Sequence, residues 1–209
     1  MSHHDSQPPA GYRFEPLTPD RWGDLEALFG ARGACGGCWC MVWRLRPAEF
    51  RVGKGEGNRR AFRAVVKKGP PPGVLAYQGD RPVGWCAVAP RDAYPRLANS
   101  RVLAPVDGRE VWSVSCLFVR REYRRQGLSE ELLKAAAGFA GSLGAEILEG
   151  YPTDTQGKDQ PAPFVWTGLA SAFAKAGFTE VARRSKTRPI MRWAAGGGAR
   201  DCGTRGLGD

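Results

Sequence analysis

The residues best placed to do chemistry lie at positions 120–129, where the sequence reads Arg-Arg-Glu-Tyr-Arg-Arg-Gln-Gly-Leu-Ser. An apolar run at 111–119 predicts a β-strand before this segment, and apolar residues at helical spacing predict a helix over 129–143. The first N–H groups of a helix lack internal partners and lie at the positive end of its dipole, so they form an anion site suited to a diphosphate. We expect the anion to be held by Arg124, Arg125, Gln126, Gly127, Leu128 and Ser129.

Gly127 suits this role because it lets the backbone approach a phosphate without an intervening Cβ. The alternative is that the arginines are a solvated surface and Gly127 an ordinary turn. Four arginines at a helix N-terminus oppose the helix dipole unless an anion compensates, which favours the anion site. The segment is not a nucleotide P-loop, because the Gly-Lys-Ser/Thr ending is missing, nor a dinucleotide-binding loop, which needs three glycines.

The composition limits the other catalytic groups. Both histidines, His3 and His4, lie in the polar first ten residues, which argues against histidine-based triads and histidine metal sites. Cys35, Cys38 and Cys40 form a C-x2-C-x-C motif, but no fourth ligand follows at a matching spacing. A structural metal and a redox pair are both less favoured than a glycine-rich turn with buried thiols, so we expect no bound metal.

The surrounding elements predict one mixed α/β domain. A Gly-Asp turn between strand-like runs predicts a hairpin over 73–90, and the sequence predicts further strands at 13–17, 145–151, 178–184 and 187–193. Thr18-Pro19-Asp20 is a helix-start signal, and the apolar residues at helical spacing after it predict a helix. Helical patterns recur over 44–68 and 167–176, whereas 91–109 is predicted to be a loop. The strand–loop–helix–strand order in the middle implies that part of the sheet is parallel.

The chain of 209 residues is 42% hydrophobic, which supports a packed core over 12–193. We expect 1–11 to be a disordered leader and 194–209 a disordered tail, since neither has much apolar surface to bury. No apolar run is long enough to span a bilayer, and the first residues do not have the pattern of a secretory signal. Six cysteines are too few for a disulfide scaffold, so we expect a cytoplasmic protein. The net charge of +10 implies an anionic partner.

With these elements in place, Arg124-x-x-Gly127-x-Ser129 between a strand and a helix resembles the acyl-CoA pyrophosphate loop of the GNAT N-acetyltransferases. The hairpin before it and the strand after it follow in the same order as in that family. Gly177-Phe178 resembles the pair that ends the family's next helix. Ser129 departs from the Gly or Ala that the family usually places last in its motif. The resemblance covers roughly 13–193.

The resemblance implies a GNAT-type single domain whose mixed sheet is partly splayed and flanked by helices. It implies acetyl-CoA as the co-substrate, and that Leu117, Phe118 and Val119 bond its pantetheine arm through backbone groups. A backbone N–H near Leu117 or Phe118 would polarise the thioester carbonyl. The expected reaction is direct attack of a primary amine, from a small molecule, on the thioester in a ternary complex. Such domains often form homodimers.

The sequence departs from the family where proton transfer is expected. Many members place a tyrosine four residues before the helix-ending glycine, and this chain has Phe173 there. A carboxylate that is common on the central strand would fall near Ser113, so it is also missing. Glu149, with Tyr151 beside it, becomes the candidate general base or substrate anchor. A structural carboxylate at a strand end is an equal alternative for Glu149.

Two further alternatives stay open. The acceptor could be a protein or peptide, or the chain could be a non-catalytic module that binds CoA or nucleic acid. The basic segment 44–68 invites a nucleic-acid interpretation, but its aromatic residues fall at core spacing rather than forming a stacking platform, so nucleic acid is the less favoured partner. The resemblance to the GNAT family implies that Trp39, Met41 and Trp43 shape the acceptor pocket, which would favour an acceptor with an apolar or planar part.

Overall fold

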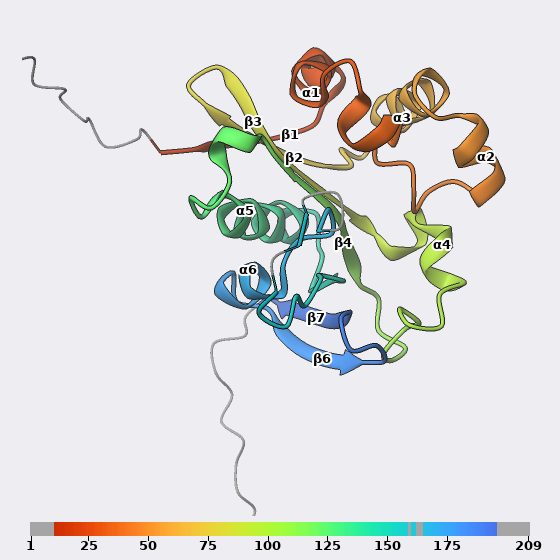
Figure 1. Ribbon diagram of the computed structural model, residues 1–209, viewed down its shortest axis with the longest axis vertical. Helices are drawn as coiled ribbons and strands as arrows, with labels where there is room; N and C mark the ends of the chain where they lie inside the picture. Colours follow the sequence, from red (N-terminus) through yellow and green to blue (C-terminus); the bar gives the residue numbers. More distant parts are fainter. Residues whose placement is uncertain (1–10, 159, 162–164, 196–209) are drawn as a thin grey trace, which may run out of the picture.

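The protein is described here from a computed structural model, which defines residues 11–158, 160–161 and 165–195. Seven strands form one mixed sheet in the order β1-β2-β3-β4-β5-β7-β6 (Figure 1). All neighbouring pairs are antiparallel except β4 and β5. The strands are β1 (Arg13–Pro16), β2 (Gly73–Gln78), β3 (Arg81–Pro90), β4 (Trp112–Val119), β5 (Ile147–Gly150), β6 (Thr179–Arg183) and β7 (Pro189–Ala194).

Helices cover both faces of the sheet (Figure 1). Because side chains alternate along a strand, Val74 and Ala76 of β2 pack with α5, whereas Leu75 and Tyr77 pack in the aromatic core under α1 and α3. The helices are α1 (Trp22–Phe29), α2 (Pro47–Val52), α3 (Glu56–Lys68), α4 (Pro95–Ala98), α5 (Leu128–Ser142) and α6 (Ala170–Lys175).

The two parallel strands separate soon after they pair. β4 and β5 share only three register pairs, the last of which joins Val114 to Gly150. A bulge in the β3–β4 pairing lies beside this point, between Ala87 and Val88, and bulges bend a strand and increase its twist. Beyond the last pair, the Leu117 N–H donates to the carbonyl oxygen of Trp166 at 2.8 Å instead of to a neighbouring strand. The sheet is therefore open along the second half of β4.

This architecture confirms the predicted fold class, a mixed and partly splayed sheet flanked by helices. Two local predictions were wrong. The helical segment 44–68 is divided into α2 and α3, because Gly53–Gly55 interrupts it and Gly55 has a φ of +82°. The predicted loop 91–109 contains the short helix α4. The predicted tails lie almost entirely outside the described residues, of whose helices none is long and apolar enough to cross a membrane.

Candidate active site

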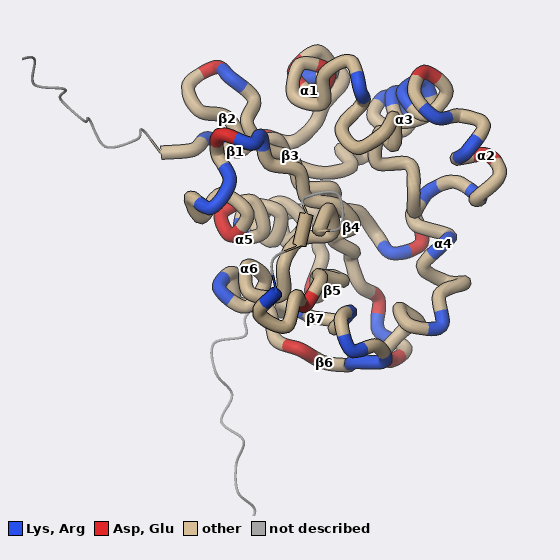
Figure 2. The backbone as a smooth tube through the Cα atoms, viewed as in Figure 1, with Lys and Arg blue, Asp and Glu red and all other residues tan. Residues whose placement is uncertain are grey.

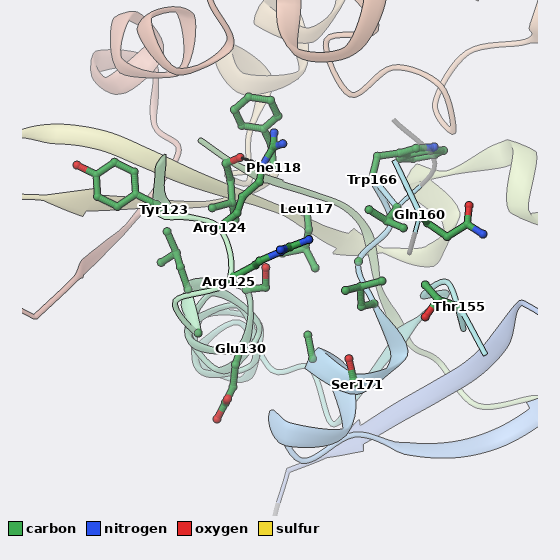
Figure 3. A pocket seen from close by; sticks show the side chains of 18 of the residues that line it. Leu117, Phe118, Tyr123, Arg124, Arg125, Glu130, Thr155, Gln160, Trp166 and Ser171 are labelled. Carbon is green, nitrogen blue, oxygen red and sulfur yellow. Dashed lines mark hydrogen bonds between the residues drawn. The ribbon is translucent and has the colours of Figure 1, made fainter. Parts of the chain in front are cut away.

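The opening between β4 and β5 leads into a cleft of about 710 Å³. Its walls come from the second half of β4, the segment that leads into α5, the segment after β5, and α6 (Figure 3). In Figure 3, Arg125 extends into the cleft from one wall, while Thr155, Gln160 and Trp166 lie on the opposite wall. Of the residues predicted for the diphosphate or pantetheine, the cleft is lined by Leu117, Phe118, Val119, Arg124, Arg125, Gly127, Leu128 and Ser129.

The N-terminus of α5 opens toward this cleft without a side-chain cap. Gly127 is the N-cap residue in a left-handed conformation, with a φ of +82°, and a Cβ there would meet nothing within 4 Å. Among the described residues, no atom therefore crowds the position of a Cβ at Gly127. Uncapped N–H groups at the positive end of a 15-residue helix are what a diphosphate requires.

The arginines before α5 have different roles. Arg120 and Arg124 brace the backbone, since Arg120 donates to the carbonyls of Pro82 and Ala27, and Arg124 donates from Nε to the Val119 carbonyl at 2.9 Å. Arg125, which has a φ of +62°, is the arginine that points into the cleft (Figure 3). Gln126 instead donates to the Glu122 carbonyl and does not line the cleft.

The backbone of β4 alternates its hydrogen-bonding groups between the cleft and β3. The Leu117 N–H faces the cleft side, where it donates to Trp166, and the Arg120 N–H faces β3, where it donates to Val83. By this alternation the backbone groups of Phe118 face β3, and Phe118 contributes its ring to the cleft, against Phe29 at 5.4 Å. A thioester carbonyl at the Leu117 N–H would have to replace the Trp166 carbonyl as its acceptor.

Glu149 and Tyr151 lie in a buried ionic network rather than on the cleft wall. Glu149 is 1% exposed, and its two carboxylate oxygens accept hydrogen bonds from Arg91 at 2.9 Å and Arg192 at 2.8 Å. The Tyr151 hydroxyl donates to Glu149 at 2.8 Å and accepts from Arg91. Burial raises the pKa of Tyr151, and the charge of Glu149 raises it further. This placement favours the structural alternative for Glu149, because two guanidinium groups already neutralise it.

Phe173 occupies the position where the family places a tyrosine, and it is fully buried beneath the point where the strands separate. A Cβ at Gly150 would lie 2.0 Å from Phe173 Cε1, and a Cβ at Gly168 would lie 2.8 Å from Cε2. Both glycines are therefore required by the close approach of this ring. Its other face packs edge-on against Phe178, with the ring centroids 5.0 Å apart.

The cysteines of the 35–40 turn lie in different surroundings. No group of three or more His, Cys, Asp or Glu residues suited to a metal occurs in the part of the chain that the structure describes. Cys35 is exposed and lines the cleft, whereas burial raises the pKa of the Cys38 thiol to about 11. Cys40 is buried and accepts a hydrogen bond from the Trp85 indole N–H at 3.2 Å.

The aromatic residues predicted for the acceptor pocket divide between core and cleft. Trp39 and Met41 are 5% and 2% exposed and belong to the core under α1 and α3. Trp43 packs against Trp166 with ring centroids 6.0 Å apart, and Trp166 lines the cleft. Sequence reasoning missed Trp166, although an isolated tryptophan before Thr-Gly in a long connection was a visible signal.

The sequence and the fold both resemble those of known acetyltransferases. Residues 39–159 match the family model described as the acetyltransferase (GNAT) family. No curated protein matches the sequence. Similar folds include a mosquito arylalkylamine N-acetyltransferase like 5b (TM-score 0.54, 12% identity, 88% of this chain and 100% of that one). They also include a GNAT acetyltransferase from Streptococcus agalactiae (TM-score 0.52, 12% identity, 88% of this chain and 96% of that one). A third is the PaiA N-acetyltransferase of Thermoplasma acidophilum in complex with coenzyme A (TM-score 0.50, 11% identity, 89% of this chain and 100% of that one).

Proposed function

Because this chain belongs to the GNAT acetyltransferase family, whose members transfer acetyl groups from acetyl-CoA, we propose that its acceptor is a primary amine of a small molecule. The amine attacks the thioester directly within a ternary complex. One observation carries the proposal: the uncapped N-terminus of α5 and the unpaired edge of β4 line the same cleft. The first suits a diphosphate, and the second suits an extended amide-bearing arm.

In this proposal the diphosphate of acetyl-CoA lies before Gly127, with Arg125 as its counter-charge, and Lys158 and Lys175 also line the cleft. The arm follows β4 past Val119 to Leu117. There the thioester carbonyl takes over the Leu117 N–H from Trp166, so that a backbone donor stabilises the oxyanion as the C–N bond forms. The C–S bond then breaks, and the thiolate of CoA leaves.

The proton of the attacking ammonium needs an acceptor before the C–N bond forms. That Glu149 is this general base stays a prediction from the sequence, and the Glu149→Gln variant tests it. If Glu149 is the base, the variant loses turnover at neutral pH and its pH–rate profile changes, while its affinity for acetyl-CoA stays the same. If Glu149 only neutralises Arg91 and Arg192, the variant loses stability and keeps the shape of the profile.

A small-molecule acceptor is favoured over a protein by the aromatic wall at one side of the cleft. Trp166 and Phe118 both line it, and apolar walls with few polar groups are typical of small-molecule sites. The alternative to an enzyme is a module that binds nucleic acid, since Lys and Arg gather over α2 and α3 (Figure 2). That surface does not line the cleft, so it bears on a second partner rather than on acetyl transfer.

Calorimetric titration with acetyl-CoA tests the proposal, with ATP as a control that carries phosphates but no pantetheine arm. We expect micromolar binding of acetyl-CoA and much weaker binding of ATP, followed by thiol release when small amines are added. Equal binding of the two would mean that the arginines form a generic anion patch. Binding without thiol release from any amine would favour the non-catalytic module.

A further inference from the structure

The wall of the cleft at Trp166 continues into a pair of tilted indole rings in contact with each other. The rings of Trp166 and Trp43 lie 6.0 Å apart at 36°. Trp166 lines the cleft (Figure 3), whereas Trp43 packs against Trp166 and is not itself part of the lining. The Trp43 indole N–H is buried and has no hydrogen-bond acceptor among the described residues. The pair therefore offers an apolar aromatic surface at Trp166 and, at Trp43, an indole donor without an acceptor.

Arg44, next to Trp43 in the chain, is a half-buried cation with few partners. Its Nη atoms make long hydrogen bonds, 3.3 Å to the Tyr94 hydroxyl and 3.4 Å to the Ala93 carbonyl, and its guanidinium lies 4.5 Å from the centre of the Tyr94 ring. Its Nε is buried and donates to nothing in the described part of the chain. Tyr94 in turn is hydrogen bonded to Ser115 of β4, beside the bulge. Arg44 is thereby linked to the strand that lines the reaction site.

Two more arginines flank the indole pair. Arg96 lies 5.8 Å from the centre of the Trp43 ring and donates to the Val42 carbonyl at 2.6 Å. Arg188 donates to the Thr167 hydroxyl at 2.6 Å, directly beside Trp166 in the chain. Burial lowers the pKa of Arg188, which is the expected effect on a cation that has no counter-charge.

These three arginines differ from the other shielded ones near the site. Arg91 and Arg192 are both paired with Glu149 at under 3 Å. Within 11–158, 160–161 and 165–195, no carboxylate lies within 4.0 Å of the nitrogens of Arg44, Arg96 or Arg188, and all their hydrogen-bond acceptors are uncharged. Partly buried cations without a counter-charge are costly unless an anion arrives to pair with them.

We propose that the acceptor amine carries a carboxylate and a planar ring, as an aromatic amino acid does. The ring lies against Trp166, which is supported by its contact with Trp43, and Arg44 and Arg188 bind the carboxylate. Arg96 holds the Trp43 ring in place. This inference rests on the proposed function, since it names the substrate class of the same site. It accounts for both the flat apolar wall and the unpaired positive charge around it, which an uncharged amine would not use.

Matched amines test this inference in a thiol-release assay at saturating acetyl-CoA. L-tryptophan is compared with tryptamine, and L-phenylalanine with 2-phenylethylamine, so that each pair differs only by the carboxylate. We expect kcat/KM to be at least about tenfold higher for the carboxylated member, as a charge-assisted hydrogen bond in a shielded site implies. Arg44→Gln and Arg188→Gln should each reduce that advantage, the ratio of kcat/KM within each matched pair, by about tenfold.

The controls separate the possible failures. Arg44→Lys keeps the charge and should retain part of the preference, and Arg60→Gln removes an exposed charge on α3 and should change nothing. Equal or better turnover of the uncharged amines overturns the inference, as does a parallel loss for both members of a pair. No turnover of any carboxylated amine by a protein that binds acetyl-CoA also overturns it. Absence of acetyl-CoA binding in calorimetry would refute the proposed function itself, and the inference with it.

Discussion

Replacing Gly127 by asparagine and by aspartate separates charge from backbone strain at the N-terminus of α5. Gly127 has a φ of +82°, and a Cβ there has open space around it. Asn and Asp are the non-glycine residues that best tolerate this conformation, and they have the same shape, so both variants carry a similar strain of about 1 kcal/mol. Only the charge differs between them.

The magnitude follows from Coulomb's law. A carboxylate at Gly127 would lie roughly 5 Å from an anion held by the first turn, which gives about 0.8 kcal/mol per unit charge in water and about 3.3 kcal/mol at an effective dielectric constant of 20. An intermediate value of about 2 kcal/mol corresponds to roughly a 30-fold loss of affinity. Gly127→Asp should therefore bind acetyl-CoA about 30 times more weakly than Gly127→Asn.

Calorimetric titration of both variants with acetyl-CoA measures this difference, and urea unfolding checks the fold. An acidic residue at a helix N-terminus is stabilising by about 0.3–1 kcal/mol, so Gly127→Asp should be at least as stable as Gly127→Asn. The affinity gap should narrow in high salt, because the Debye length falls from about 10 Å at 0.1 M to about 3 Å at 1 M. Equal affinities at low salt would refute the placement of the diphosphate before Gly127.

Two further predictions concern the packing below the cleft and the thiol on its wall. Gly150→Ala should lower the free energy of unfolding, measured in urea, by about 3 kcal/mol, because its Cβ would lie 2.0 Å from the buried Phe173 ring. Adding Phe173→Leu to Gly150→Ala should recover part of this loss, whereas the control Gly138→Ala on the exposed surface of α5 should be stabilising. An unchanged unfolding midpoint for Gly150→Ala would contradict the packing. At pH 7–8 iodoacetamide should alkylate the exposed Cys35, and acetyl-CoA should slow this reaction because Cys35 lines the cleft. Cys38 should react appreciably only as the pH approaches its raised pKa of about 11. Peptide mapping that finds Cys38 labelled as fast as Cys35 at pH 7 would contradict this prediction.

Local patterns along the chain were sufficient to predict the elements of the core. The strand-like runs on either side of the Gly79-Asp80 turn predicted the hairpin over 73–90, and the helical period in 129–143 reflects burial of one helix face. The strands β2 and β3 and the helix α5 form close to the predicted residues. The strand–loop–helix order around Gly127 similarly predicted the anion site, because a helix N-terminus is a property of a contiguous segment. The division of 44–68 was missed because a continuous basic pattern hid the glycine that ends α2.

Most of the elements, the N-terminus of α5 before the cleft and the family to which they point follow from the sequence alone, since each depends on neighbours in the chain. The short helix α4 and the break within 44–68 do not. Which distant residues meet depends on the tertiary structure. Glu149 looks available at a strand end, yet Arg91 and Arg192, 58 and 43 residues away, neutralise it. Trp43 and Trp166 likewise come together only when the segment after β5 folds over the open edge of β4. Long-range charge pairing and packing depend on that arrangement in space, which no local period records.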